Sequence, residues 1–251
     1  MPVELVSIEL TNYCSKGCPF CYAKSSSDGK TYWNIDLLVV FIRDLARNGI
    51  KAVSFGGGEP LQFPGIWKLL VQLRSIGVFK SITTNGLPLL EPGAIALLPG
   101  FVDKVHVSLH YPEHQHEVLR VIRQVKELEE AGVKSGINFV LKQQNATQEA
   151  AAVRAIRDAG ITAERVIFLP LRGKGVQINH ERFRQVAYEI GSNFQSTWCL
   201  QGCRKLPKSV SIDWEGKVGW CSYTEARSPM MEFTYNGMME ALHARGLVYC
   251  G

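Results

Sequence analysis

The sequence lacks the features that would place the protein in a membrane, outside the cell or on nucleic acid. No apolar run is long enough to span a bilayer, because residues 37–42 are followed at once by Arg43 and Asp44. No charged and apolar leader of the secretory type precedes the first predicted strand, so we expect a cytoplasmic protein. The formal charge is only +5, without a long basic run, so neither a membrane nor a nucleic acid is an expected partner.

What the chain does contain is typical of an enzyme with metal-binding cysteines. Its 251 residues are 46% hydrophobic, which is enough for one barrel-sized core with a small appendage. Seven cysteines in a chain without a leader favour a reducing compartment and metal ligation over disulfides. The mild positive charge suits an anionic substrate slightly better than a cationic one.

Apolar runs typical of strands alternate with amphipathic helical runs, which is the pattern of parallel β-α units. The predicted strands are residues 3–10, 51–55, 79–84, 102–109, 134–141 and 165–169, and helices are expected to begin near residues 35, 64, 91, 113, 146 and 179. Six units predict an α/β fold, a partial (β/α)6 TIM-like barrel over residues 1–192, with a small β-hairpin and helix extension over 193–251. Functional motifs of such a barrel are expected at the C-terminal strand ends.

The first predicted strand leads into a loop with Cys14, Cys18 and Cys21. This spacing lets one short loop ligate three irons of a four-iron cluster and leave the fourth iron open for a ligand. Two alternatives use the same residues: a structural zinc knuckle, and a thioredoxin-like redox pair of Cys18 and Cys21. The zinc site would need a fourth ligand close by, and the redox pair has no use for Cys14.

The cysteine loop, with Phe20 at its aromatic position, resembles the C-x3-C-x-aromatic-C signature of the radical S-adenosylmethionine (radical SAM) superfamily. The resemblance implies a [4Fe–4S] cluster whose open iron chelates S-adenosylmethionine. It also implies an external one-electron reductant, such as flavodoxin or ferredoxin. In this family, one electron cleaves the sulfonium to methionine and a 5′-deoxyadenosyl radical, which takes a hydrogen atom from a carbon of the substrate. The cofactor supplies that chemistry, and the protein orients the reactants and excludes water.

After the second predicted strand comes a glycine-rich loop that resembles the G-G-E-P loop of the same family. The resemblance implies that its backbone and carboxylate hold the ammonium of S-adenosylmethionine, using Gly57, Gly58, Glu59 and Pro60. Glycines permit a close approach to a ligand, and a carboxylate accepts hydrogen bonds from a cation. The loop does not fit a phosphate site, because no Gly-Lys-Ser/Thr follows it.

The third predicted strand ends in Thr84 and Asn85, before a glycine. The family resemblance places such a turn beside the cofactor, whereas a plain Asn-Gly turn is the alternative.

Polar residues take every second position of the fourth predicted strand. Strand alternation sends His106, Ser108 and His110 into the barrel lumen. Ser108 followed by Arg120 resembles the pair that binds the cofactor's carboxylate in related enzymes, since arginine can engage a carboxylate bidentately. The alternative for Arg120 is a solvated charge, because it shares a helix face with Arg123 and a lysine.

Two further residues are expected near the cofactor and three near the substrate. The resemblance places Asn138 near the ribose and Leu171 along the adenine. His110 and Tyr111 are expected within reach of the substrate, although a lumen histidine is also compatible with a hydrogen-bonded core residue. Arg172, on a loop with glycines, is expected to receive an anionic substrate group, and a charged surface turn is the alternative.

The last part of the chain carries the four remaining cysteines, Cys199, Cys203, Cys221 and Cys250. Residues 209–214 and 217–222 are predicted to form a β-hairpin. Cys203, twelve residues, Gly216, four residues and Cys221 resemble the opening of SPASM and twitch extensions, and the later C-x2-C-x5-C portion is missing. A twitch extension with a second, auxiliary [4Fe–4S] cluster is therefore implied. A zinc-stabilised hairpin is the alternative, and if Cys250 is not a ligand the cluster has a site for substrate.

Together these features predict a radical SAM enzyme of the oxidoreductase or lyase type. We expect hydrogen abstraction from a small, anionic metabolite and net oxidation through the auxiliary cluster. A ribosomal peptide remains an alternative substrate, modified by crosslinking, thioether formation or epimerisation. A noncatalytic iron–sulfur electron carrier is the alternative from another class, and it would not need the glycine-rich loop, Ser108 or Arg120.

Overall fold

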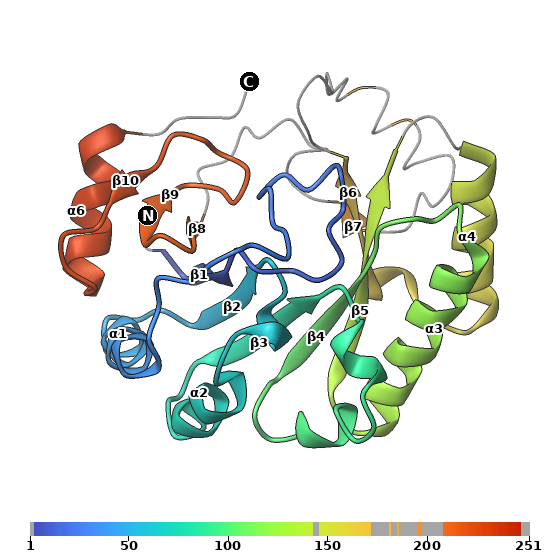
Figure 1. Ribbon diagram of the computed structural model, residues 1–251, viewed down its shortest axis with the longest axis horizontal. Helices are drawn as coiled ribbons and strands as arrows, with labels where there is room; N and C mark the ends of the chain where they lie inside the picture. Colours follow the sequence, from blue (N-terminus) through green and yellow to red (C-terminus); the bar gives the residue numbers. More distant parts are fainter. Residues whose placement is uncertain are drawn as a thin grey trace. The chain divides into compact units, whose positions relative to one another are not determined.

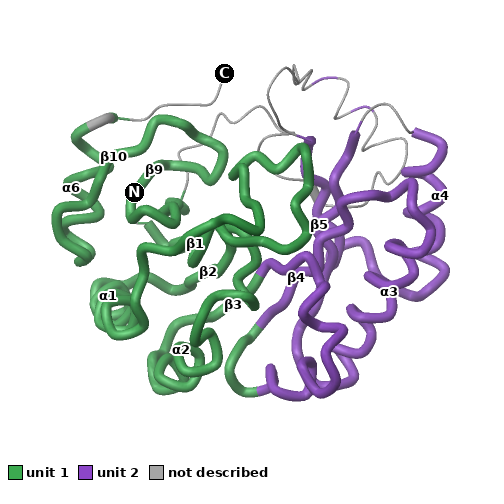
Figure 2. Tube along the Cα trace, in the orientation of Figure 1, with its two compact units in different colours: residues 1–82, 100–103, 205–251 green, residues 83–99, 104–204 purple. Residues whose placement is uncertain are grey.

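A computed structural model describes residues 3–142, 146–171, 181, 185, 195–196 and 208–246. The chain divides into two compact units, shown in green and purple in Figure 2. Unit 1 comprises residues 1–82, 100–103 and 205–251, and unit 2 comprises residues 83–99 and 104–204. The predicted boundary between residues 192 and 193 lies outside the described residues.

Unit 1 is built on strands from both ends of the chain. The strands are β1 (Leu5–Thr11), β2 (Ala52–Gly57), β3 (Phe79–Thr84, whose last two residues belong to unit 2), β8 (Ser209–Ile212), β9 (Lys217–Gly219) and β10 (Ser228–Pro229). They pair in the order β10-β9-β8-β1-β2-β3 (Figure 1). β1 is parallel to both β2 and β8, whereas β8, β9 and β10 form an antiparallel meander. The predicted hairpin is thus confirmed, with shorter strands.

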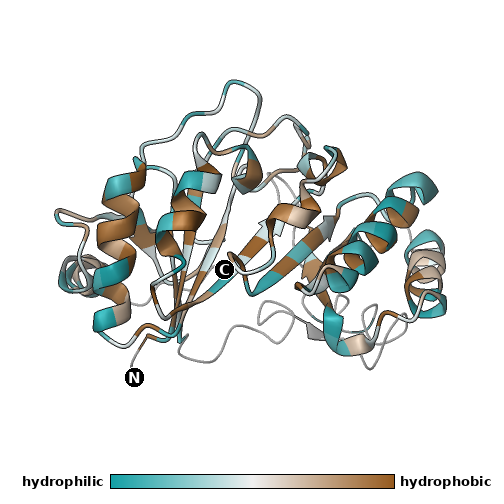
Figure 3. Ribbon diagram, turned by 90° about the horizontal axis from the view of Figure 1, so that it is seen from below, coloured by the Kyte–Doolittle hydropathy of each residue, from teal (hydrophilic) through white to brown (hydrophobic). Residues whose placement is uncertain are grey.

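The helices of unit 1 are α1 (Ile35–Arg47), α2 (Ile66–Leu73) and α6 (Tyr235–Arg245). Asn34 starts α1 by accepting a 2.7 Å hydrogen bond from the Leu37 N–H, as an N-cap residue does. The apolar face of α1 supplies Phe41 and Ile42 to a core that contains the fully buried Ile8 of β1. Figure 3 shows hydrophobic residues (brown) on the strands, whereas the helices carry both hydrophobic and hydrophilic (teal) residues.

Unit 2 is a parallel β-α arrangement. Its strands are β4 (Lys104–Leu109), β5 (Lys134–Leu141), β6 (Val166–Pro170) and β7 (Gln195–Ser196), paired in that order, and its helices are α3 (Gln115–Glu130) and α4 (Ala146–Asp158). Alternation along β4 buries Val105, Val107 and Leu109 completely. Phe139 of β5 and Phe168 of β6 meet edge to face at 5.2 Å between ring centroids.

The six predicted strands of the barrel are all present, but the prediction of a helix near residue 91 is wrong. The chain forms only two 3-10 turns there, Pro88–Leu90 and Ile95–Leu97. Pro92 and Gly93 stand between these turns, and Gly93 has a φ of +80°, which interrupts any helix. The helix expected near residue 179 lies outside the described residues. Among the described residues, no helix is long and apolar enough to cross a bilayer.

Candidate functional site

The loop with the three N-terminal cysteines begins at the end of β1. Cys14 is buried, Cys18 and Cys21 are partly exposed, and none of the three is in a disulfide. The Cys21 N–H donates to the Cys18 carbonyl at 3.0 Å, and the Cys14 N–H donates to the Ser26 carbonyl at 2.9 Å. Gly17 has a φ of +55°, a conformation that suits glycine. The sequence therefore folds into a hydrogen-bonded turn with three thiols on it.

Within the part of the chain that the structure describes, no three cysteine, histidine or carboxylate side chains converge on one point as the ligands of a single metal ion do. A four-iron cluster takes one thiolate at each of several irons, so its ligands need not converge on one point.

The glycine-rich loop after β2 packs directly on the cysteine loop. The Gly58 N–H donates to the Thr11 carbonyl at 2.7 Å, and the Glu59 N–H donates to the Tyr13 carbonyl at 2.8 Å. A Cβ on Gly58 would lie 2.1 Å from the Tyr13 carbonyl oxygen, and Gly57 has a φ of +106°. Glycine is required at both positions, because one has no room for a side chain and the other adopts a left-handed conformation.

A side-chain contact also joins the two loops. The Ser15 N–H donates to Gln62 Oε1 at 3.1 Å, and Gln62 Nε2 donates to Ser15 Oγ at 2.8 Å. Glu59, which precedes the 3-10 turn Pro60–Gln62, is fully buried. Its Oε1 accepts from the Leu61 N–H at 3.1 Å, so the carboxylate caps this turn. Part of the hydrogen-bonding capacity of Glu59 therefore serves the loop itself. Pro60 is buried, and Phe20 of the cysteine loop is partly exposed.

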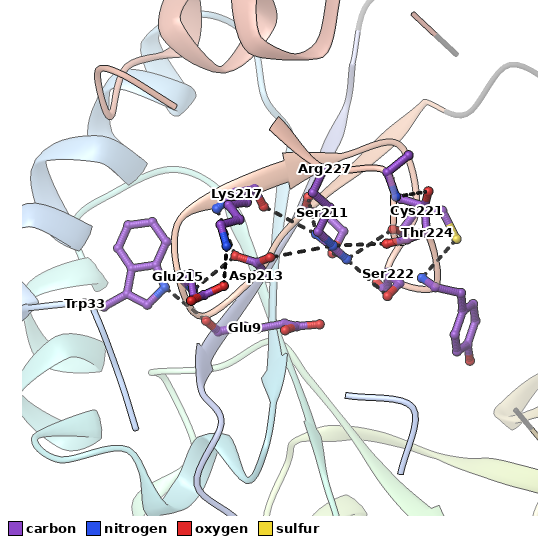
Figure 4. A network of polar contacts seen from close by, with 12 residues as sticks. Glu9, Trp33, Ser211, Asp213, Glu215, Lys217, Cys221, Ser222, Thr224 and Arg227 are labelled. Atoms are coloured by element: carbon purple, nitrogen blue, oxygen red, sulfur yellow. Dashed lines mark hydrogen bonds and ion pairs between the residues drawn. The ribbon is translucent and has the colours of Figure 1, made fainter. Parts of the chain in front are cut away.

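Glu9 of β1 is a buried carboxyl group that the sequence reasoning missed. It is 5% exposed, and burial raises its pKa to about 7, with the charge of Asp213 adding to this effect and that of Arg227 opposing it. Its backbone carbonyl accepts from Trp33 Nε1 at 3.0 Å (Figure 4). The sequence does contain a signal for this residue: Glu9 directly follows the buried Ile8 in β1, so its side chain points to the opposite face of the strand.

Of the four C-terminal cysteines, only Cys221 is among the described residues, and it lies on a loop of unit 1 after β9. Its side chain is partly exposed, and its Sγ accepts from the Tyr223 N–H at 3.3 Å. The Tyr223 ring packs edge to face on Tyr22, with 4.8 Å between the ring centroids. Because Tyr22 follows Cys21 in the sequence, the two cysteine-bearing loops are in contact. Cys199, Cys203, Cys250 and Arg172 lie outside the described residues.

In unit 2, Thr84 and Asn85 form a capped turn and are both buried. The Gly86 N–H donates to Thr84 Oγ1 at 3.0 Å, and the Leu87 N–H donates to Asn85 Oδ1 at 2.8 Å. Both side chains therefore stabilise the turn, which agrees with the alternative interpretation of this segment as a plain Asn-Gly turn. Gly86 has a φ of +79° and faces α3, where a Cβ would lie 2.5 Å from Arg120 Nη1.

Arg120 of α3 is held by Gln124, a residue that the sequence reasoning did not select. Arg120 Nη1 donates to Gln124 Oε1 at 2.8 Å, and Gln124 Nε2 donates to the Gly86 carbonyl at 2.6 Å. The Arg120 side chain is 13% exposed, compared with 61% for Arg123 on the same helix, and burial lowers its pKa. Its Nη2 is buried without a hydrogen-bond partner among the described residues and lies 4.0 Å from Glu117 Oε2. Arg120 is thus not a solvated charge.

Ser108 of β4 and Asn138 of β5 are buried opposite each other in the parallel register. Leu171 follows β6, and its N–H donates to the Leu141 carbonyl at 2.9 Å. His106, two residues before Ser108, has a buried Nε2 without a partner among the described residues, and burial lowers its pKa to about 4. A Cβ on Gly136 of β5 would lie 2.8 Å from this nitrogen, so the glycine leaves room for the imidazole.

The segment after β4 is fixed by a second unpredicted carboxylate. Glu117 Oε1 accepts from the backbone N–H of His110 at 2.8 Å and of Tyr111 at 3.2 Å. Lys142, after β5, places its Nζ 4.1 Å from the centre of the Tyr111 ring and 2.7 Å from Glu113 Oε1. His110 and Tyr111 are both partly exposed, and Tyr111 stacks on the exposed His114.

An equivalent contact occurs one strand further on. The Lys142 N–H donates to Oε1 of the fully buried Glu149 at 2.6 Å, as the His110 N–H does to Glu117. Burial raises the pKa of Glu149, and the charge of Glu113 adds to the effect. In both cases a glutamate in the first turn of a helix binds the backbone that leaves the preceding strand.

A family model described as "Radical SAM superfamily" matches residues 8–173. A probable GTP 3′,8-cyclase of Sulfurisphaera tokodaii is 27% identical over 196 residues, which are 73% of this chain and 62% of that protein. The sporulation killing factor maturation protein SkfB of Bacillus subtilis is 24% identical over 162 residues, or 61% of this chain and 40% of SkfB. This chain thus spans less than two thirds of either relative.

Among solved structures, Streptococcus suis SuiB bound to S-adenosylmethionine aligns with a TM-score of 0.70 at 17% identity, covering 91% of this chain and 63% of SuiB. This likeness shows the fold alone, and it confirms the predicted α/β class of the partial-barrel type.

Proposed function

The chain belongs to the radical SAM superfamily, and on this premise we propose that it reductively cleaves S-adenosylmethionine and abstracts a hydrogen atom from a carbon of its substrate. The observation that carries the proposal is the joining of two motifs within unit 1. The cysteine loop after β1 and the glycine-rich loop after β2 are 40 or so residues apart and are connected by two backbone hydrogen bonds, at 2.7 and 2.8 Å. An electron carrier would have no need for the second loop.

The residues present fit a [4Fe–4S] cluster. Three thiols lie on one hydrogen-bonded turn, and none of them is in a disulfide. We propose Cys14, Cys18 and Cys21 as the ligands, which leaves one iron open for S-adenosylmethionine. When bound, the cluster supplies the electron for cleavage of the sulfonium. The contribution of the protein is to bind the cofactor, to orient it and to exclude water.

For the cofactor we propose residues from the motifs named above. In unit 1, the backbone of the glycine-rich loop and the carboxylate of Glu59 bind the ammonium group, with Phe20 packing beside the cluster. Arg120 and Ser108 bind the carboxylate. The buried Nη2 of Arg120 has no hydrogen-bond partner among the described residues and so supplies a donor for an anion. The remaining contacts to ribose and adenine are assigned to Thr84, Asn85, Asn138 and Leu171.

The leading substrate class is a small, anionic metabolite, with His110, Tyr111 and Arg172 at the substrate. Similarity to the probable GTP 3′,8-cyclase, whose name specifies a nucleotide, supports this class. A peptide substrate is the second possibility, since SuiB has also been solved bound to its precursor peptide SuiA. Flavodoxin or ferredoxin is the proposed electron donor.

We further propose an auxiliary [4Fe–4S] cluster with Cys221, Cys199, Cys203 and Cys250 as ligands, which accepts an electron from the substrate during net oxidation. The contact of Tyr22 with Tyr223 supports a functional relation between the two cysteine-bearing loops. This electron acceptor is the reason for assigning the oxidoreductase type of reaction.

The test is anaerobic reconstitution of the whole chain with iron and sulfide, followed by iron counting and detection of 5′-deoxyadenosine by mass spectrometry. We expect about eight irons per chain and dithionite-driven formation of 5′-deoxyadenosine. Replacing Cys14, Cys18 and Cys21 by Ala should abolish 5′-deoxyadenosine, whereas Cys221→Ala should retain it and lose about half of the iron. Formation of 5′-deoxyadenosine by the triple variant would refute the assignment of the cysteine loop.

A further inference from the structure

Arg227 makes an unusually dense set of contacts with the loop that carries Cys221. Its side chain is only 10% exposed. Nη2 donates to the carbonyl oxygen of Cys221 at 3.2 Å and of Ser222 at 3.1 Å, and Nε donates to the Thr224 carbonyl at 3.2 Å (Figure 4). Three carbonyls of one short loop are therefore bound by a single side chain.

The same guanidinium also reaches the strands of the hairpin. Nη1 donates to the Ser211 carbonyl of β8 at 3.1 Å and approaches the Lys217 carbonyl of β9 at 3.4 Å. Only arginine can do this, because its five N–H donors lie in one plane on a rigid fork, whereas a lysine presents a single charged nitrogen. Arg227 thus connects the loop to both strands on which it stands.

The glycine at the end of β9 makes this arrangement possible. A Cβ on Gly219 would lie 3.2 Å from Arg227 Cγ and 2.7 Å from Thr224 Cγ2. The arginine stem and the loop therefore pack into space that a larger residue would fill.

The positive charge of Arg227 is partly balanced by acids of unit 1. Its Nε lies 3.8 Å from Asp213 Oδ2, and its charge also acts on the buried Glu9. The charge is therefore held at a defined place, next to the peptide group of Cys221.

On the other side of the loop, Tyr223 completes the support of Cys221. Its N–H donates to Cys221 Sγ at 3.3 Å, and its ring packs on Tyr22 of the N-terminal cysteine loop. The loop from Gly219 to Arg227 is therefore held by the hairpin on one side and by the N-terminal cysteine loop on the other.

We propose that Arg227 is the positioning residue of Cys221: it holds the loop that carries Cys221 in place before metal binds, and it places a positive charge beside the ligand. The inference rests on the proposed function, in which Cys221 ligates the auxiliary cluster. Residues that orient a ligand typically change metal affinity by about 10- to 100-fold when replaced. A positive charge beside a cluster also favours its reduced state, because reduction adds a negative charge.

The experiment uses the full chain with Cys14, Cys18 and Cys21 replaced by Ala, so that only the auxiliary site binds iron. In this background we compare Arg227 with Arg227→Gln and Arg227→Lys, and measure iron loss to a chelator and the midpoint potential by EPR-monitored titration. Both variants should lose iron about 10- to 100-fold more readily. Only Arg227→Gln should shift the potential to a more negative value, because lysine keeps the charge.

Lys217→Gln is the matched control. Lys217 is a cation on the same hairpin, with its side chain 43% exposed and paired with Glu215 rather than with the Cys221 loop. It should leave both iron retention and the potential unchanged. Equal effects of Lys217→Gln and Arg227→Gln, or wild-type behaviour of Arg227→Gln, would overturn the proposal.

Two further measurements separate the possible failures. If Cys221→Ala keeps all iron in the same background, the proposed ligand role of Cys221 fails, and not only the role of Arg227. If the arginine variants do not fold, hydrogen exchange of the metal-free wild-type chain decides. The amides of residues 219–224 should be protected before any metal is added, and unprotected amides would refute a loop that is held ready.

Discussion

Replacing Gly58 by alanine should uncouple the glycine-rich loop from the cysteine loop. The added Cβ would lie 2.1 Å from the Tyr13 carbonyl oxygen and 2.7 Å from its carbonyl carbon, both backbone atoms. Because a rigid backbone cannot yield as a flexible side chain does, the two segments must move apart. The hydrogen bonds from the Gly58 N–H to Thr11 and from the Glu59 N–H to Tyr13 would then break.

The expected loss can be worked from these two hydrogen bonds. Each contributes about 1 kcal/mol net, and partners left buried and unsatisfied add about 1–3 kcal/mol. We therefore expect Gly58→Ala to lower the free energy of unfolding by about 3–5 kcal/mol, which is roughly two to four orders of magnitude in the folding equilibrium. Urea denaturation of the metal-free chain measures this value by linear extrapolation.

Gly56→Ala is the matched control, two residues earlier, near the end of β2. A Cβ on Gly56 would have no neighbour within 4 Å, and its φ lies outside the left-handed region. This variant should stay within about 0.5 kcal/mol of the wild type. If the two variants have the same stability, the close approach of the two loops is not what determines the glycine at position 58.

Two other predictions concern charged residues. Because the pKa of Glu9 is raised from 4.5 to about 7 in the folded protein, the native state binds more protons than the unfolded state between these values. The free energy of unfolding of the wild type should fall by up to about 3 kcal/mol as the pH rises through that window. Glu9→Gln should remove this fall in urea titrations at several pH values. If the variant keeps the same pH dependence, Glu9 is not the group that titrates. Arg120→Ala should weaken S-adenosylmethionine binding by about 10- to 100-fold, as measured by equilibrium dialysis of the reconstituted protein. Arg123→Ala, at an exposed position of α3, should leave this affinity unchanged. Equal losses of affinity in the two variants would argue against the proposed carboxylate contact.

The strands were predictable because their signal is local. Residues 79–84 and 134–141 have the predicted bounds, since apolar strand residues and flanking glycines define them in the sequence alone. The helix predicted near residue 91 does not form, because Pro92 and Gly93 interrupt the helical pattern there.

The candidate cofactor residues could be predicted from sequence motifs, whereas the residues that hold them in place could not. Gln124, Glu117 and Arg227 act on partners 38, 7 and 16 residues away, at Gly86, His110 and Ser211. A glutamine or glutamate in an amphipathic helix has the same sequence signal whether it faces solvent or a buried carbonyl. Only the packing of the chain distinguishes the two, which is why this supporting layer required a structure.

The parallel pairing of β1 with β8 sets the timing of assembly during synthesis. Leu5 lies opposite Ser209, so the first strand receives this neighbour only after the ribosome has made about 200 more residues. At about 5–20 residues per second, this takes roughly 10–40 seconds. Throughout that interval, the nascent chain carries the first three cysteines in a loop that follows a strand with one side unpaired. Until β8 is made, β1 therefore presents a strand edge with unpaired backbone N–H and C=O groups, which is open to pairing with other chains.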